Sequence, residues 1–179
     1  TAISVLFAVA LSAQEKNDDK AKAAIEHLKS PDKQVRLEAI RDLMFCGKQY
    51  AKEIAGLLID GESDVRREAV DALLILASKE YADAVAPMLK DKDASVRLSA
   101  DKALWFFDAQ QHAGAVAESP KDQDEKVREM AAQALGAFGA REYVGEVLPL
   151  LNDKGRNVRI AAAGARSHIG GKTYAKEIA

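Results

Sequence analysis

Hydrophobic residues recur along the chain with a period close to 31 residues. The repeated pattern is V-R-x-x-A-x-x-x-L, and the steps between its successive valines are 30, 31, 31 and 31 residues. The valines are Val35, Val65, Val96, Val127 and, in a weaker copy, Val158. In each copy the valine and the residues 4, 7, 8 and 11 positions later lie on one side of a helical wheel. One motif that returns at one period indicates a helical array rather than a single closed globule.

A second pattern predicts a shorter helix ahead of each motif. Tyrosines recur near the start of this helix at intervals of one or two periods, and a histidine occupies the position between the second and third. The residues are Tyr50, Tyr81, His112, Tyr143 and Tyr174. The sequence YAKEIA at residues 50–55 returns at residues 174–179. Each repeat is therefore predicted to be a shorter first helix followed by a longer second helix. The chain is expected to stop inside a new first helix, so that the array is truncated at its C-terminal end.

Each second helix is predicted to bury one stripe of side chains. In the third repeat this stripe consists of Val96, Ala100, Ala103, Leu104 and Phe107. The alanine four positions after the valine lets two helices approach closely, because a larger side chain would force them apart. Ten positions after the valine, large apolar residues are expected to seal adjacent repeats together. They are Phe45, Ile75 and Phe106.

An arginine follows each valine and forms a column beside the predicted core. The column consists of Arg36, Arg66, Arg97, Arg128 and Arg159. Acidic residues precede these arginines along the chain. We therefore expect each guanidinium to bridge to an acid or to a loop carbonyl of a neighbouring repeat. A ladder of anion-binding sites is the alternative interpretation.

The combination of a first helix, a D-x-x-V-R turn, A-x-x-x-L and a closing glycine resembles HEAT repeats, in the short bacterial form also seen in phycobilisome lyase subunits. The resemblance covers about residues 19–179. It implies an all-α fold, an α-solenoid forming a right-handed superhelix of about five two-helix repeats. The fourth repeat departs from the pattern, because Ser119 and Pro120 replace the apolar pair seen at Leu57 and Leu58.

The first thirteen residues differ in composition from the rest of the chain. Residues 1–13 carry no charge and end in small residues, and a polar stretch follows them. This pattern is typical of the end of a secretory signal peptide. We therefore predict a signal-peptide remnant at residues 1–13, a repeat domain at residues 14–179, and a periplasmic or extracellular location. An apolar first helix or a short membrane anchor is the alternative; no span is expected in the mature chain.

Charge and chemistry narrow the function classes. The net charge is −2 and the pI is about 6.0. The chain has no excess of basic residues, so we do not expect it to bind nucleic acid. The histidines, His27, His112 and His168, lie in different repeats, so we expect no metal site and no other cofactor. HEAT-repeat hydroxylases bind iron through His-Glu pairs, which this sequence lacks. The single cysteine, Cys46, occupies a core column and is expected to be a small buried residue.

The best candidate for a functional surface lies opposite the predicted core. Positions 2 and 9 after each valine should point away from the core, and in the first three repeats most are apolar. The predicted partner-binding residues are Leu37, Met44, Arg67, Leu74, Leu98 and Trp105. The resemblance implies that second helices line a concave surface, where such a stripe could hold a peptide or helix. Arg41, Asp71 and Lys102, six positions after their valines, would lie at the rim. Packing against another subunit, a missing domain or flanking repeats is the alternative.

The sequence therefore predicts a non-catalytic scaffold that binds a protein or peptide partner through its second helices. Two alternatives remain open. One is a subunit of an enzyme resembling the bilin lyases, in which the concave face would hold a tetrapyrrole. The other is a structural spacer in a larger secreted protein. Resemblance of fold alone does not name a ligand.

Overall fold

The computed structural model describes residues 16–169, and within that range all regular structure is helical. The chain divides into two compact units, Thr1–Leu76 (unit 1) and Ala77–Ala179 (unit 2). The predicted signal-peptide remnant at residues 1–13 lies outside the described residues. The same is true of the predicted start of a further repeat at residues 174–179.

Unit 1 contains two second helices and the first helix that lies between them in sequence. Residues 16–27 are also helical. The second helices are α2 (Lys33–Cys46) and α4 (Ser63–Ile75), and they pack against each other. The first helix is composite, with η1 (Lys48–Tyr50), α3 (Ala51–Ala55) and η2 (Gly56–Ile59) in succession.

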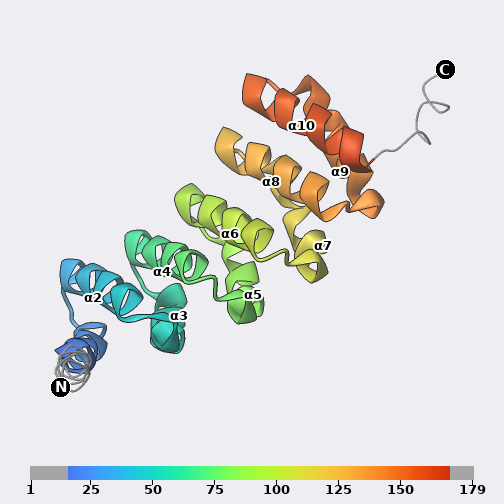
Figure 1. Ribbon diagram of the computed structural model, residues 1–179. Coiled ribbons are helices and arrows are strands. Elements are labelled where there is room, and N and C mark those ends of the chain that lie inside the picture. Colours follow the sequence, from blue (N-terminus) through green and yellow to red (C-terminus); the bar gives the residue numbers. More distant parts are fainter. Residues whose placement is uncertain (1–15, 170–179) are drawn as a thin grey trace, which may run out of the picture. The chain divides into compact units, whose positions relative to one another are not determined.

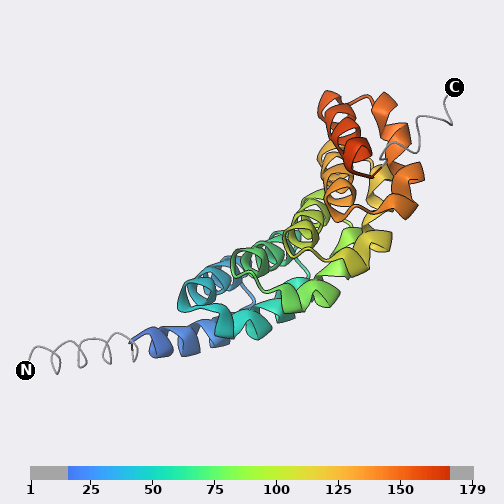
Figure 2. The same ribbon diagram turned by 45° about the vertical axis from the view of Figure 1, so that its right-hand side comes forward.

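Unit 2 repeats this arrangement three times. Its second helices are α6 (Ala94–Phe106), α8 (Glu125–Phe138) and α10 (Arg156–Ile169). Its first helices contain α5 (Ala82–Val85), α7 (Ala113–Val116) and α9 (Val144–Val147). The 3-10 turns that flank these are η3 (Lys79–Tyr81), η4 (Ala86–Lys90), η5 (Gln110–His112), η6 (Ser119–Lys121), η7 (Arg141–Tyr143) and η8 (Leu148–Asn152). Both ribbon views show α6, α8 and α10 side by side in one layer and α5, α7 and α9 in a second layer (Figures 1 and 2). The predicted all-α helical-repeat class is confirmed.

The second helices begin and end at the same place in each repeat because the sequence provides the caps. Asp32, Asp93 and Asp124 each accept a hydrogen bond of 2.8 Å from the backbone N–H two residues later. Twelve positions after the valine, the chain takes a positive φ whether or not a glycine is present. The residues are Gly47, Ala77, Asp108 and Gly139. The repeat geometry therefore overrides the intrinsic preference of alanine at this turn, whereas aspartate enters the left-handed region more readily.

The core lies between the two layers and contains the predicted stripe. Val96, Ala100, Ala103 and Leu104 are fully buried, and Phe107 is 8% exposed. In the first four repeats a further column, five positions after the valine, is also fully buried, although the helical wheel did not predict it. Its members are Ile40, Val70, Asp101 and Ala132. The buried arc is wider than one stripe because each second helix packs against first helices as well as against its neighbours in the layer.

The column ten positions after the valine is solvent-exposed, and the prediction that it seals adjacent repeats is wrong. Phe45, Ile75 and Phe106 are 79%, 66% and 60% exposed. The second helices α8 and α10 meet through small residues. A Cβ added at Gly136 on α8 would lie 2.7 Å from the Cα atom of Ala165 on α10.

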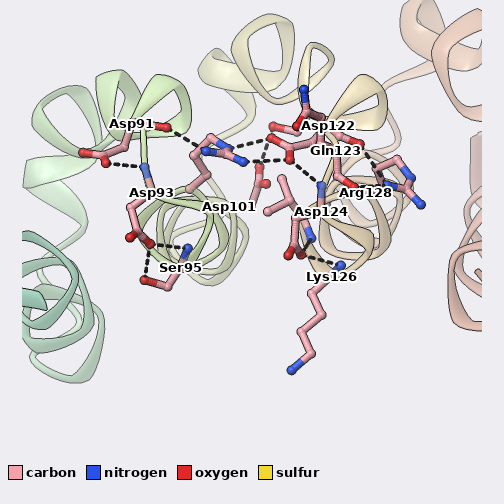
Figure 3. A network of polar contacts seen from close by, with 12 residues as sticks. Asp91, Asp93, Ser95, Asp101, Asp122, Gln123, Asp124, Lys126 and Arg128 are labelled. Atoms are coloured by element: carbon pink, nitrogen blue, oxygen red, sulfur yellow. Dashed lines mark hydrogen bonds and ion pairs between the residues drawn. The ribbon is translucent and has the colours of Figure 1, made fainter. Parts of the chain in front are cut away.

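The arginine column joins successive loops, as predicted. Arg36 in unit 1 and Arg97 and Arg128 in unit 2 each form a two-pronged ion pair with the aspartate of the following loop. The pairs are Arg36–Asp60, Arg97–Asp122 and Arg128–Asp153, at 2.6–2.9 Å. The remaining amino group of each donates to a carbonyl of its own loop. Figure 3 shows the part of this network around Asp122 and Arg128.

Asp101 is a buried carboxyl group in a column that is otherwise apolar. Its Oδ1 atom accepts a hydrogen bond of 3.3 Å from Ser119 Oγ, and Figure 3 shows the Asp101 side chain below Asp122. Its Oδ2 atom has no hydrogen-bond partner among the described residues. Burial raises the pKa of Asp101 well above its ordinary value, and the charge of Asp122 acts in the same direction. The hydrogen bond from Ser119 and the charge of Arg97 lower this pKa, but burial outweighs them.

We expect the free energy of unfolding to fall as pH rises from the ordinary carboxyl range toward the raised pKa of Asp101. The folded state keeps a proton in this interval that the unfolded chain releases, so the unfolded state is favoured as pH rises. Asp101→Asn cannot ionise and should remove this part of the pH dependence. Denaturant titrations at several pH values test it, with Asp108→Asn, at an exposed aspartate, as the control. Equal pH slopes for wild type and Asp101→Asn would contradict the assignment.

Candidate interaction surface

In unit 1 the predicted partner-binding residues differ in their exposure. Leu37 is 6% exposed and belongs to the core, whereas Met44 and Leu74 are half-buried. Arg67 donates to Asp71 at 3.0 Å and lies 3.8 Å from a carboxylate oxygen of Glu68. Its guanidinium is therefore already engaged by acids of its own helix. Of the predicted residues in unit 1, Met44 and Leu74 are therefore the ones that offer apolar surface.

In unit 2 the two predicted residues, Leu98 and Trp105, lie two helical turns apart on α6. Leu98 is half-buried and Trp105 is 43% exposed, while Leu104 beside it is fully buried. Each residue lines a separate hollow in the layer of second helices. The structure therefore places both on an accessible surface.

Hollow A lies between α6 and α8 and has a volume of about 230 Å³. Its lining residues are Leu98, Lys102, Lys126, Glu129, Met130 and Gln133. Leu98 and Met130 supply apolar surface, and Lys102 and Lys126 supply positive charge. The Glu129 carboxylate accepts a hydrogen bond of 3.4 Å from Gln133 Nε2. The predicted rim position of Lys102 thus coincides with the lining of this hollow.

Hollow B has a volume of about 290 Å³ and shares Gln133 with hollow A. Its lining residues are Trp105, Gln133, Gly136, Ala137, Ala161, Gly164, Ala165 and His168. Five of these eight are glycine or alanine, so the lack of side chains on α8 and α10 creates the space. His168 is oriented by a hydrogen bond of 2.9 Å between its Nδ1 atom and the Gly164 carbonyl. We call the residues lining hollows A and B the unit 2 surface.

Sequence reasoning missed the contribution of α8 and α10 to this surface. Gly136 and Gly164 are not among the predicted partner-binding residues, whereas in the structure both line hollow B. Met130, three positions after its valine, also lies outside the columns that the wheel selected. The sequence feature that could have identified this surface is the presence of glycine at these positions, near the exposed Trp105.

Metal-ligating clusters, the cysteine and the length of the helices are further features that bear on function. Among residues 16–169 no group of three or more His, Cys, Asp or Glu side chains is arranged to hold a metal ion. Cys46 is 6% exposed, and burial raises the pKa of its thiol, which disfavours the reactive thiolate. No helix in the described part of the chain is both long and apolar enough to cross a membrane.

The family model for HEAT repeats matches residues 8–105 and 114–178. The chain belongs to the HEAT-repeat family. A search among curated proteins gave no match. Solved structures with a similar fold share about a fifth of their residues with this HEAT-repeat chain, so the likeness concerns the fold alone.

Three of these structures illustrate the range. An engineered protein is 21% identical, with a TM-score of 0.73 over 88% of this chain and 85% of its own. The complex of CpcE and CpcF of phycocyanin lyase from Nostoc sp. PCC7120 gives 22% identity and a TM-score of 0.69, over 88% of this chain and 68% of that chain. A designed armadillo repeat protein in complex with the peptide (KR)4 is 20% identical, with a TM-score of 0.65 over 87% of this chain and 84% of its own.

Proposed function

We propose that this HEAT-repeat chain is a non-catalytic protein-interaction scaffold and that a partner polypeptide binds the unit 2 surface. The observation that carries the proposal is the exposure of Trp105 beside a hollow whose floor is made of glycine and alanine. Tryptophan side chains next to an apolar recess are the residues that most often dominate binding energy at protein interfaces. A side chain of the partner would fill hollow B and contact the indole ring.

The size of the hollows favours a polypeptide over a large cofactor. Hollows A and B measure about 230 and 290 Å³, below the roughly 300–1,000 Å³ typical of small-molecule sites. Each suits one side chain of a docked chain better than a tetrapyrrole. Two of the similar structures, a CpcE–CpcF complex and a designed repeat protein with a bound peptide, support polypeptide binding by this architecture. We also propose export of the chain, on the apolar composition of residues 1–13.

The proposal is tested by panning a random peptide library on the immobilised chain and measuring the enriched peptides against three variants. Trp105→Ala removes the indole ring, and Gly164→Leu fills hollow B. A Cβ at Gly164 meets nothing within 4 Å, so this variant should fold. Gly145→Leu, at an equally open glycine on α9, is the matched control.

We expect the enriched peptides to bind Gly145→Leu as they bind wild type. Their affinity for Trp105→Ala and Gly164→Leu should be about tenfold or more lower, the size of loss expected for an interface anchor. Enriched peptides that bind all four proteins equally would place the binding surface elsewhere. A library that yields no binder would favour the structural spacer.

A further inference from the structure

We propose that the segment bound by the unit 2 surface is acidic. It would place a carboxylate between Lys102 and Lys126 over hollow A and an aromatic or branched apolar side chain in hollow B. This inference rests on the proposed function, because it names the chemistry of the partner at the same surface.

Two lysines give hollow A positive charge. Lys102 and Lys126 are both exposed, and the side chain of neither makes an ion pair or hydrogen bond within the described residues. Several other lysines of the chain form ion pairs with nearby acids. These include the pairs Lys20–Asp42, Lys33–Asp64 and Lys121–Glu146. Hollow A therefore combines two unpaired ammonium groups with apolar side chains.

One carboxylate also lines hollow A, and its position matters for the balance of charge. Glu129 accepts a hydrogen bond from Gln133, which holds it on the α8 side of the surface. The two lysines outnumber it, so the lining of hollow A carries a net charge of about +1. A partner with negative charge is therefore attracted and a basic partner is repelled.

The spacing along α6 sets the register of the bound segment. Leu98, Lys102 and Trp105 follow one another at intervals of four and three residues, so they share one face of the helix. With a rise of 1.5 Å per residue, Leu98 and Trp105 are separated by about 10 Å along the axis. An extended peptide spans that distance in about three residues. Lys102 is nearer to Trp105 than Leu98 is, so the predicted motif is an acidic residue with a large apolar side chain within about three positions of it.

Hollow B determines what kind of apolar side chain fits. The backbone of α10 at Gly164 is open, and Trp105 forms one wall. The lining contains no acidic side chain. An aromatic or branched side chain can lie against the indole ring there, which is favourable for both groups. The adjacent positive hollow and apolar hollow together select a segment that carries both features.

The experiment uses two synthetic peptides of about ten residues with the same apolar centre. One carries Asp and Glu on its flanks and the other carries Lys and Arg. Trp105 is the only tryptophan of the sequence, so its intrinsic fluorescence reports binding at this surface directly. We expect the acidic peptide to shift the emission and to bind about tenfold or more tightly than the basic one at low salt. The difference should shrink at high salt, because both lysines are exposed.

Charge reversal at the lysines is the decisive comparison. Lys102→Glu combined with Lys126→Glu should reverse the preference between the two peptides. Lys90→Glu combined with Lys92→Glu, at exposed positions outside both hollows, should leave it unchanged. The proposal that the bound segment is acidic would be overturned by equal binding of the two peptides, by a preference for the basic peptide, or by no binding of either. If library peptides bind through Trp105 and are basic, the scaffold function stands and only this inference fails.

Discussion

Leu104→Ala is expected to lower the free energy of unfolding by about 2–5 kcal/mol. Leu104 is fully buried at the centre of the stripe that α6 presents to the first helices, and Val96 and Ala100 on the same stripe are fully buried as well. Truncation removes apolar contacts and leaves a cavity that these short neighbours cannot fill. The loss therefore combines the transfer free energy of the deleted atoms with the cost of the cavity.

Denaturant unfolding followed by circular dichroism and by Trp105 fluorescence measures this loss. The chain has two compact units, so the fluorescence transition is the relevant one, since Trp105 reports on unit 2. Leu98→Ala is the matched control, because it makes the same change on the same helix at a half-buried position. We expect a clearly smaller loss for Leu98→Ala. Equal stability of Leu104→Ala and wild type would show that the core stripe is assigned wrongly.

The repeats and their core were predictable because they depend on local properties of the chain. A motif that recurs every 31 residues places one stripe on every second helix. Val96, Leu104 and their counterparts satisfy that stripe, and Asp32, Asp93 and Asp124 cap the helices in sequence-local turns. None of these features requires knowledge of how one repeat packs on the next.

The exposed columns were harder to predict because a helical wheel shows which way a side chain points but not which neighbouring helices lie on that side. Leu37 and Trp105 lie on nearly the same side of their helices, yet Leu37 is 6% exposed and Trp105 is 43% exposed. Phe106 was expected to seal a repeat interface, but its side chain is 60% exposed. Which column becomes buried depends on contacts between repeats, and a single helix does not encode them.

The candidate site shows the same division between what one helix encodes and what several helices assemble. Leu98, Lys102 and Trp105 belong to α6, and their positions on one face follow from their spacing. Met130 and Gln133 come from α8 and enter the site only because α8 lies beside α6. The space of hollow B results from absent side chains, which a search for apolar or charged residues in the sequence does not register.

Arg128→Ala is expected to destabilise unit 2 by about 3–5 kcal/mol, because it breaks a buried ion pair from one side. The side chains of Arg128 and Asp153 are only 7% and 11% exposed. Arg128 donates to both carboxylate oxygens of Asp153 at 2.8 and 2.9 Å and to the carbonyls of Asp122 and Gln123 at 2.9 Å. The variant leaves the carboxylate without its counter-ion and two carbonyls without this donor.

Arg159→Ala separates the contribution of the ion pair to stability from that of the hydrogen bonds to loop carbonyls. Arg159 occupies the same column and donates to the carbonyls of Asp153 and Lys154 at 2.7 and 3.1 Å, but it forms no ion pair within residues 16–169. Its replacement should cost clearly less than that of Arg128. The Arg128 guanidinium also lowers the pKa of Asp153, so the wild-type advantage over Arg128→Ala should shrink as pH falls through that lowered pKa. Denaturant titrations at neutral and acidic pH measure both effects, and equal losses for the two arginine variants would assign the column's stability to the carbonyl bonds alone.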